Sequence, residues 1–243
     1  MIVFATLVDV TLRALLGRRR TLLLVLLAGV PVIVALLARI GGARLDDALV
    51  AILELGVRTV LPLTALVFGT SALGSEVEDG TAVYLLAKPI PRWQVALAKT
   101  FVAGLLAALL NVGSTLLTGI LIGGFAGEEL ATTVAFAGAT AVAAFTYGAL
   151  FVAASVVTGR ALILGLAYTL IWEGILAGIL EGTRLFSVRE ATLTVAEALA
   201  PARAGIDGDL DPPAAIALLA IVLLGSLVVT TVRLRSYEVR GAD

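Results

Sequence analysis

One carboxylate interrupts a long apolar stretch of the chain. Glu173 lies deep in the apolar run 161–181, directly after Trp172. In the middle of a bilayer, a charged carboxylate costs about 2.5–3.5 kcal/mol or more unless it is protonated, paired or hydrated. Such a group either binds a proton, a cation or a polar cargo, or it has a structural partner. The sequence leaves both readings of Glu173 open.

Two further polar sets interrupt apolar runs. Glu54 and Arg58, four residues apart in the run 49–73, have the spacing of a helical ion pair. A stripe in the run 97–123 has the spacing i, i+3, i+4 and i+7, which puts its members on one helical face. Its members are Asn111, Ser114, Thr115 and Thr118. These groups either line a translocation path or form hydrogen bonds between helices, and for the stripe we favour the hydrogen bonds.

The residue types that are missing exclude most enzymes. The chain has no Cys and no His. This excludes thiolate and imidazole metal sites, Ser-His-Asp triads and thiol nucleophiles. We therefore expect no metal site and no catalytic residue. The 17 basic and 18 acidic residues lack the basic excess that nucleic-acid binding needs, so we expect no nucleic-acid partner.

The elements that position these residues are predicted to be membrane-spanning helices. Apolar residues make up 60 % of the chain, charged residues 14 %, and the mean hydropathy is +1.09. A soluble domain has about 25 % charged residues. Six apolar runs are each long enough to cross about 30 Å of hydrocarbon as a helix: 21–39, 49–73, 97–123, 131–157, 161–181 and 213–232. The sequence thus predicts an all-α, polytopic protein of the lipid bilayer, with six transmembrane helices in a single domain, residues 1–243.

Prolines and glycines modify these predicted helices. Pro31 and Pro62 fall inside the first and second runs and are expected to kink them. Glycines spaced four apart allow helices to approach closely. These glycines are Gly119 and Gly123 in the third run, and Gly174, Gly178 and Gly182 at the end of the fifth.

Basic residues predict the orientation in the membrane. With six spans, eleven basic residues fall on the side of the termini: Arg13, Arg18, Arg19, Arg20, Lys88, Arg92, Lys99, Arg160, Arg233, Arg235 and Arg240. Five fall on the other side: Arg39, Arg44, Arg184, Arg189 and Arg203. Because short cytoplasmic loops are rich in Lys and Arg, we expect both termini to be cytoplasmic and the protein to lie in the cell membrane.

Two segments outside the spans are predicted to be helical. Residues 1–20 are amphipathic, with Asp9 and Arg13 spaced to pair, which suits a helix in the cytoplasmic interface. Residues 182–212 form the longest polar insertion and are expected to be extracellular. There, Ser187 and Glu190 have the spacing of a capping box, which predicts a short extracellular helix that ends before Pro201.

The cytoplasmic segment between the second and third spans, 74–95, has a pattern of its own. Ser75 and Glu78 again have capping-box spacing and predict the start of a short amphipathic helix. Pro89 ends this helix, and Pro91 begins the next one. The result is a helix-turn-helix elbow that faces the cytosol.

This elbow resembles that of the permease subunits of type-2 ATP-binding-cassette (ABC) exporters. Those subunits have six spans and an interfacial N-terminal helix, with a segment reading roughly E-x-x-x-G-T-x-x-x-L-L-x-x-P-x-x-R between the second and third spans. In this chain the pattern falls on Glu76, Gly80, Thr81, Leu85, Leu86, Pro89 and Arg92, with Lys99 several residues on. The resemblance implies that the pattern residues from Glu76 to Arg92, together with Glu78, couple the permease to an ATPase subunit.

The resemblance also implies partners. The permease would act with a second copy of itself or a homologous permease, and the second and fifth spans would line the interface between them. The chain has no G-x-x-x-x-G-K-[ST] motif, so ATP and Mg²⁺ are expected on a separate ATPase chain and no cofactor on this one. Two alternatives remain open: an ion-coupled secondary transporter that uses Glu173, and a membrane anchor that transports nothing. The sequence does not identify the cargo.

Overall fold

The computed structural model describes residues 2–42, 45–78, 90–179, 181–201, 206, 208 and 210–236. Every regular element within these ranges is helical. In chain order the elements are α1 (Ile2–Leu15), α2 (Arg18–Ala28), α3 (Val30–Ile40), α4 (Leu45–Leu55), the π-helix η1 (Gly56–Val60), α5 (Leu61–Glu78), α7 (Arg92–Gly123), α8 (Gly127–Val157), α9 (Ala161–Ala167), the π-helix η2 (Tyr168–Leu176), α10 (Ala177–Ile179), α11 (Glu181–Arg184), α12 (Val188–Leu199) and α13 (Pro212–Ser236). The predicted all-α fold is confirmed.

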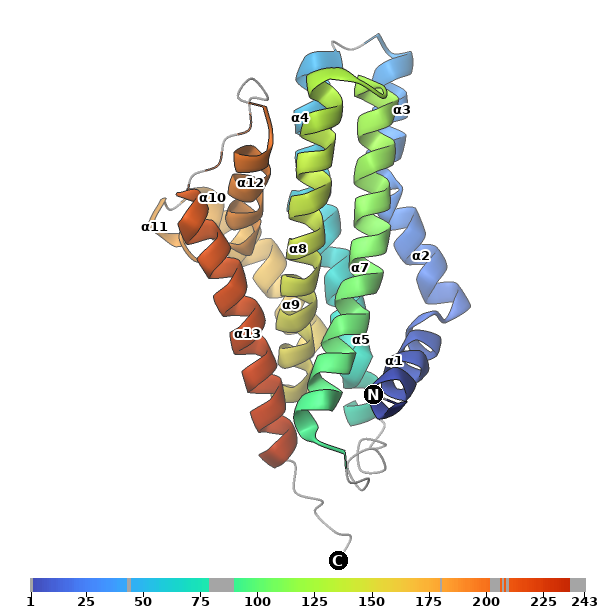
Figure 1. Cartoon of the computed structure of the whole chain (residues 1–243), viewed down its shortest axis with the longest axis vertical. Coiled ribbons are helices and arrows are strands. Elements are labelled where there is room, and N and C mark those ends of the chain that lie inside the picture. The colour runs from blue at the N-terminus through green and yellow to red at the C-terminus, as the bar shows by residue number, and fades with distance from the viewer. Residues whose placement is uncertain are drawn as a thin grey trace, which may run out of the picture.

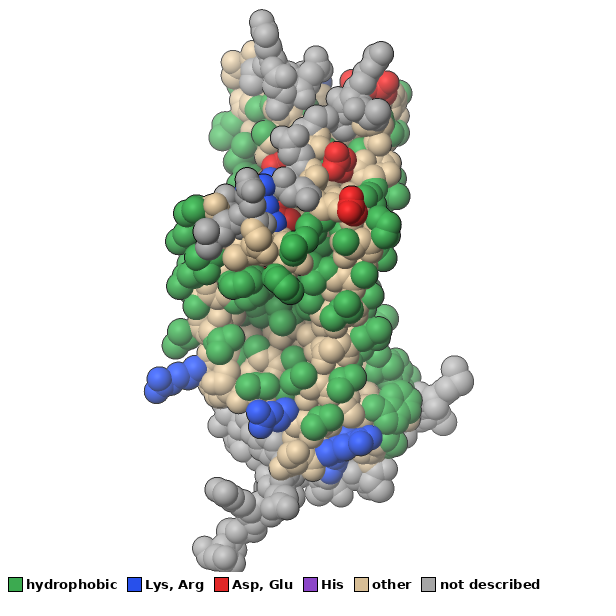
Figure 2. Space-filling view, turned by 90° about the vertical axis from the view of Figure 1, so that its left-hand side faces the viewer, with side chains coloured by type: hydrophobic (Ala, Val, Ile, Leu, Met, Phe, Trp, Pro, Cys, Tyr) green, Lys and Arg blue, Asp and Glu red, His purple; other side chains and the backbone are tan. Residues whose placement is uncertain are grey.

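The long helices form a bundle with two distinct ends (Figure 1). Helices α7 and α8 run side by side through its centre, with α2 and α3 on one side and α13 on the other. We call the end near α1 and the last turns of α13 the terminal end. The opposite end, with the turn between α7 and α8, is the distal end. On the face in Figure 2, most basic side chains lie toward the terminal end. The acidic side chains, with basic atoms beside them, lie toward the distal end, and a hydrophobic band lies between.

Five helical segments in the described residues are long and apolar enough to cross a membrane. They are Arg20–Ile40, Ala48–Gly74, Arg92–Gly123, Gly127–Val157 and Pro212–Ser236, and each matches a predicted span. The predicted span 161–181 differs. Its apolar helix is short, Ala161–Leu176, and is wound as a π-helix from Tyr168 onward. The count of six spans therefore stays a prediction.

Small residues bring α7 and α8 into close contact. A Cβ atom added at Gly104 would lie 2.9 Å from the Cα atom of Phe145, and one added at Gly148 would lie 3.1 Å from the Cα atom of Gly104. The glycines predicted to allow close approach do so here, since a Cβ at Gly119 or Gly123 would overlap side chains of α8. Neither Gly174 nor Gly182 comes within 4 Å of another described helix in this way.

Both predicted proline distortions are confirmed. The first span breaks between α2 and α3 at Gly29, two residues before Pro31. The second span widens into η1 immediately before Leu61 and Pro62. Proline has no N–H to donate and its ring displaces the carbonyl one turn earlier, so the helix preceding it cannot keep its α-helical hydrogen bonds.

The predictions for the segments outside the spans have mixed outcomes. The N-terminal segment is helical as α1, and the Arg13 Nε atom donates to Asp9 at 3.1 Å. The prediction that Ser75 and Glu78 begin a new helix is wrong, because both lie in the last turns of α5, which continues without a break to Glu78. No Pro separates the second span from these residues, so the helix simply extends through them.

Candidate functional site

The predicted coupling elbow is described only at its two margins. Residues Gly80, Thr81, Leu85, Leu86 and Pro89 lie outside the described residues. Glu76 and Glu78 lie at the end of α5, where the backbone alone is described. Arg92 is the first residue of α7, with Pro91 as its N-cap, as predicted. The coupling role of these eight residues remains a prediction.

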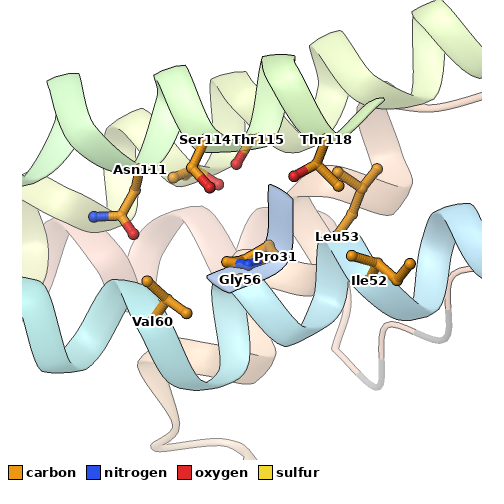
Figure 3. Close-up of a pocket in the computed structure, with 10 residues that line it drawn as sticks. Pro31, Ile52, Leu53, Gly56, Val60, Asn111, Ser114, Thr115 and Thr118 are labelled. Carbon is orange, nitrogen blue, oxygen red and sulfur yellow. The ribbon is translucent and has the colours of Figure 1, made fainter. Parts of the chain in front are cut away.

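The polar stripe lies inside the subunit, on the face of α7 that points toward α3, η1 and α8. Its members line a narrow cavity of about 10 Å³, room for about one water molecule, together with Pro31, Ile52, Leu53, Gly56, Val60 and Thr140. Figure 3 shows the four stripe side chains, Asn111, Ser114, Thr115 and Thr118, facing Pro31 and Gly56 across this cavity. Neither the prolines nor the stripe spacing reveals from the sequence that the stripe faces the distorted helices.

Hydrogen bonds connect part of this stripe to the distorted helices. The Nδ2 atom of Asn111 donates to the hydroxyl of Thr64 at 2.6 Å, and that hydroxyl donates to the Leu61 carbonyl at 2.9 Å. The hydroxyl of Ser114 donates to the Ala28 carbonyl, at the break between α2 and α3. These contacts are the interhelical bonds that we favoured for the stripe.

The predicted pair of Glu54 and Arg58 is part of a larger ionic chain. The Nε atom of Arg58 donates to Glu54 at 2.8 Å, which confirms the pairing. The same guanidinium lies 3.5 Å from the carboxylate of Glu190 on α12. Glu190 also accepts from Arg189 at 2.9 Å, and the side chains of both are less than a tenth exposed. The pair thus ties the second span to α12.

Glu173 caps the first turn of α12. Its carboxylate accepts hydrogen bonds from the Val188 N–H at 3.0 Å, the Arg189 N–H at 3.3 Å and the hydroxyl of Ser187. The hydroxyl of Tyr168 donates to it at 2.6 Å. The first N–H groups of a helix have no partner within the helix, and the helix dipole favours an anion there. These four donors are the structural partner that the sequence left open for Glu173.

The π-winding of η2 brings two of these groups together. Tyr168 and Glu173 are five residues apart, and at 3.6 residues per turn an α-helix would place them about 140° apart. A π-helix closes its hydrogen bonds between residues i and i+5, so residues at this spacing lie on neighbouring positions. The winding therefore allows the Tyr168 hydroxyl to reach the carboxylate.

The capping box predicted for α12 is half confirmed. Ser187 is the N-cap, and its hydroxyl accepts from the Glu190 N–H at 3.1 Å. The side chain of Glu190 bonds to Arg189 and Arg58 rather than reaching back toward Ser187. Glu173, rather than Glu190, is the carboxylate that accepts hydrogen bonds from the first N–H groups of α12.

The candidate residues thus fall into three separate places. One is the margin of the elbow at the terminal end, and the second is the α7 stripe. The third is a distal polar cluster that comprises Glu54, Arg58, Tyr168, Glu173, Ser187, Arg189 and Glu190. The sequence did not predict that Tyr168 and Arg189 belong to this cluster, since neither has a helical spacing that pairs it with Glu173. Within the described ranges, no group of three or more Asp or Glu residues is placed to hold a metal ion.

A comparison with protein families identifies the family to which this helical chain belongs. The profile of the ABC-2 family transporter proteins matches residues 12–236, almost the whole chain. No curated protein matches the chain. The profile covers α2 to α13 and thus the whole helical bundle, the margins of the elbow and the distal polar cluster. The chain belongs to the ABC-2 transporter family and is a multi-pass membrane permease of the ABC type.

Proposed function

We propose that this permease is the membrane half of an ATP-driven exporter whose ATPase is a separate polypeptide. The observation that carries the proposal is the ABC-2 family match over residues 12–236 in a chain that has no P-loop sequence. A P-loop is the element that holds the phosphates of ATP in such motors. The energy for transport must then come from a partner chain that carries one.

The ATPase is proposed to dock at the terminal end. The elbow margins, at the end of α5 and the start of α7, lie at this end of the bundle (Figure 1). Most of the basic side chains visible in Figure 2 also lie there, which supports a cytoplasmic terminal end by the positive-inside rule. In this arrangement the protein lies in the cell membrane, both of its termini are cytoplasmic, and α12 is extracellular.

A cavity at the terminal end supports export as the direction. A cavity of about 280 Å³ lies between α5, Arg20 of α2 and the turn from α8 to α9. Its polar lining includes Thr70, Ser155 and Thr158. It lies between the second span and the short helix of the predicted fifth span, the two elements proposed to face a second permease subunit. A cargo that enters from the cytoplasm would meet this cavity first.

The distal polar cluster argues against a secondary transporter that uses Glu173. The side chain of Glu173 is 1 % exposed and accepts four hydrogen bonds from the protein. These bonds account for a buried carboxylate without a transported proton or cation. We therefore assign Glu173 a structural role in the exporter.

Association with an ATPase tests the proposal. The purified permease alone should not hydrolyse ATP, and a P-loop partner captured from native membranes should do so. Glu76→Arg, at the elbow margin, should weaken capture of the partner or uncouple hydrolysis from export. Glu128→Arg makes the same charge change at an exposed distal position and should leave both unchanged. Hydrolysis by the isolated chain, or equal capture by both variants, would refute the proposed arrangement.

Reporter fusions test the orientation separately. Reporters placed after Asp243 and at Gly80 should both read cytoplasmic, whereas one inserted within residues 205–210 should read external. The unequal distribution of basic residues is the reason. An external reading at Gly80 would remove the docking site from the side where ATP is available.

A further inference from the structure

The cavity beside the polar stripe contains two hydroxyls that the protein leaves unbonded. Thr118 on α7 and Thr140 on α8 are 0 % and 1 % exposed, and both line the cavity. Neither hydroxyl has a hydrogen-bond partner among the described residues. The other buried threonines of α8, Thr132, Thr133 and Thr146, each bond to the carbonyl one turn earlier. Buried polar groups in native proteins are nearly always hydrogen-bonded.

The cavity lies where two spans are irregular at the same level. Pro31 stands just after the break between α2 and α3, and Gly56 is the first residue of η1. A Cβ atom added at Gly56 would lie 3.8 Å from the Cγ atom of Pro31, so the two residues face each other with little side chain between them (Figure 3). The polar stripe of α7 closes the opposite wall.

We propose that this cavity is a binding site for an internal water molecule held by the hydroxyls of Thr118 and Thr140. Buried waters bridge two to four polar groups that the protein itself leaves unsatisfied, whereas cavities that stay dry are apolar. Here the lining offers two free hydroxyls together with the polar groups of Asn111, Ser114 and Thr115.

Water fits this lining better than a cation does. Each free hydroxyl has a proton to donate as well as lone pairs to offer. A cation would use only the lone pairs and leave both protons unbonded. Among the described residues, no charged side chain lines the cavity, so a buried cation would have no counter-charge there to offset its desolvation. A water molecule accepts and donates without adding charge.

With the proposed water bound, the middle of the second span is a hydrated position at which the helix can bend. In η1 the hydrogen bonds are of the i to i+5 kind, and Pro62 supplies no N–H to the turn before it. A water at this level can exchange partners when the span bends, which a packed apolar side chain cannot do. This role is independent of the proposed ATPase partner and of the direction of transport.

Radiolytic labelling of the full-length permease in lipid nanodiscs tests the site. X-ray pulses turn a bound water into hydroxyl radicals that oxidise the side chains beside it. Leu53 lines the cavity and is 2 % exposed, whereas Leu66 is equally buried but does not line it. We expect oxidation of Leu53 and none of Leu66. The oxygen incorporated from H₂¹⁸O should appear at Leu53 only after slow exchange.

Removal of the hydroxyls should remove the water. The double variant Thr118→Val with Thr140→Val keeps the shape of both side chains and should lose the labelling of Leu53. Thr146→Val on the same helix removes a hydroxyl that bonds to its own backbone and should keep the labelling. An unlabelled Leu53 in the wild type, or equal labelling in the double variant, would overturn the proposal.

A second variant keeps the test valid if the double variant does not fold. Gly56→Ala places a methyl group in the cavity at an ordinary contact distance from Pro31, so it fills the water site without a clash. It should lose the labelling of Leu53. Gly113→Ala adds the same methyl group where nothing lies within 4 Å and should leave the labelling intact. Retained labelling in Gly56→Ala would also contradict the proposed site.

Discussion

The two π-helices η1 and η2 have different origins but meet at the same place. η1 directly precedes Leu61 and Pro62 in the second span, and the missing N–H of that proline accounts for it. η2 contains no proline, and it holds the buried Glu173. A charged residue from each reaches the first turn of α12, since Arg58 of η1 contacts Glu190 and Glu173 of η2 caps Val188 and Arg189.

This difference teaches where each irregularity is encoded. The η1 turn has a local cause, which is visible in the sequence as one proline. In η2 the carboxylate of Glu173 bonds to donors 14 to 16 residues later in the chain, so the cause is a contact in three dimensions. A substitution at the local cause should change one turn, and a substitution at the distant contact should change α12 as well.

The largest effect is expected from Glu173→Ala. Loss of the carboxylate leaves the Ser187 hydroxyl and two N–H groups of α12 without their acceptor. We expect the free energy of unfolding to fall by about 3 kcal/mol, since hydrogen bonds to charged groups contribute roughly 1.5–3 kcal/mol each and are not additive. Reversible unfolding in mixed micelles measures this fall, and hydrogen exchange of residues 188–191 should accelerate.

Glu173→Gln is the control for this prediction. The amide keeps one acceptor oxygen for the start of α12 and removes the buried charge, so its loss of stability should be clearly smaller. An Ala variant as stable as the wild type would show that η2 does not depend on the cap.

A smaller effect is expected from Arg58→Met. This change removes the link between η1 and α12 and leaves Glu190 with Arg189 as its partner. Because the side chain of Arg58 is 34 % exposed, we expect a loss of only about 1 kcal/mol. Arg13→Met breaks the exposed pair with Asp9 on α1 and should cost no more than about 0.5 kcal/mol. Equal losses in the two variants would mean that the contact with Glu190 contributes nothing.

Pro62→Ala is expected to change local hydrogen exchange rather than overall stability. The new N–H gives a carbonyl of η1 a backbone donor, so amide exchange across residues 56–66 should slow. The removal of proline also makes the unfolded chain more flexible, and the net change should stay within about 1 kcal/mol. Exchange in η2 should not change. Unaltered exchange at residues 56–66 would show that the proline is not the cause of η1.

Much of this protein could be predicted from residue types alone. A chain that is 60 % apolar and 14 % charged is expected in a membrane, where every backbone polar group needs a partner within the chain. Its long, continuous apolar runs meet that need as helices. The positions of the long helices followed from the lengths of the apolar runs. Local signals were equally reliable where proximity in sequence is proximity in space, as in the pair Glu54 and Arg58 and the N-cap Ser187.

Local signals gave wrong predictions where the same residues are compatible with two backbone conformations. Ser75 and Glu78 have the spacing of a helix start, yet α5 runs through them, since spacing alone does not break a helix. The run 161–181 is apolar enough to suggest a regular span, but its second half is wound as a π-helix around Glu173. Hydropathy reports how apolar a run is and carries no information on how its hydrogen bonds are closed.

The tertiary structure alone decided which polar groups meet. The sequence showed Glu173, the pair in the second span and the stripe on the third as three separate features. The fold brings Glu173 and Arg58 to the first turn of the same helix, and it points the stripe toward the irregular segments at Pro31 and Gly56. These contacts join residues that are tens of positions apart. Their partners are set by the packing of α3, η1, α7, α8 and α12, which no periodicity within a single helix encodes.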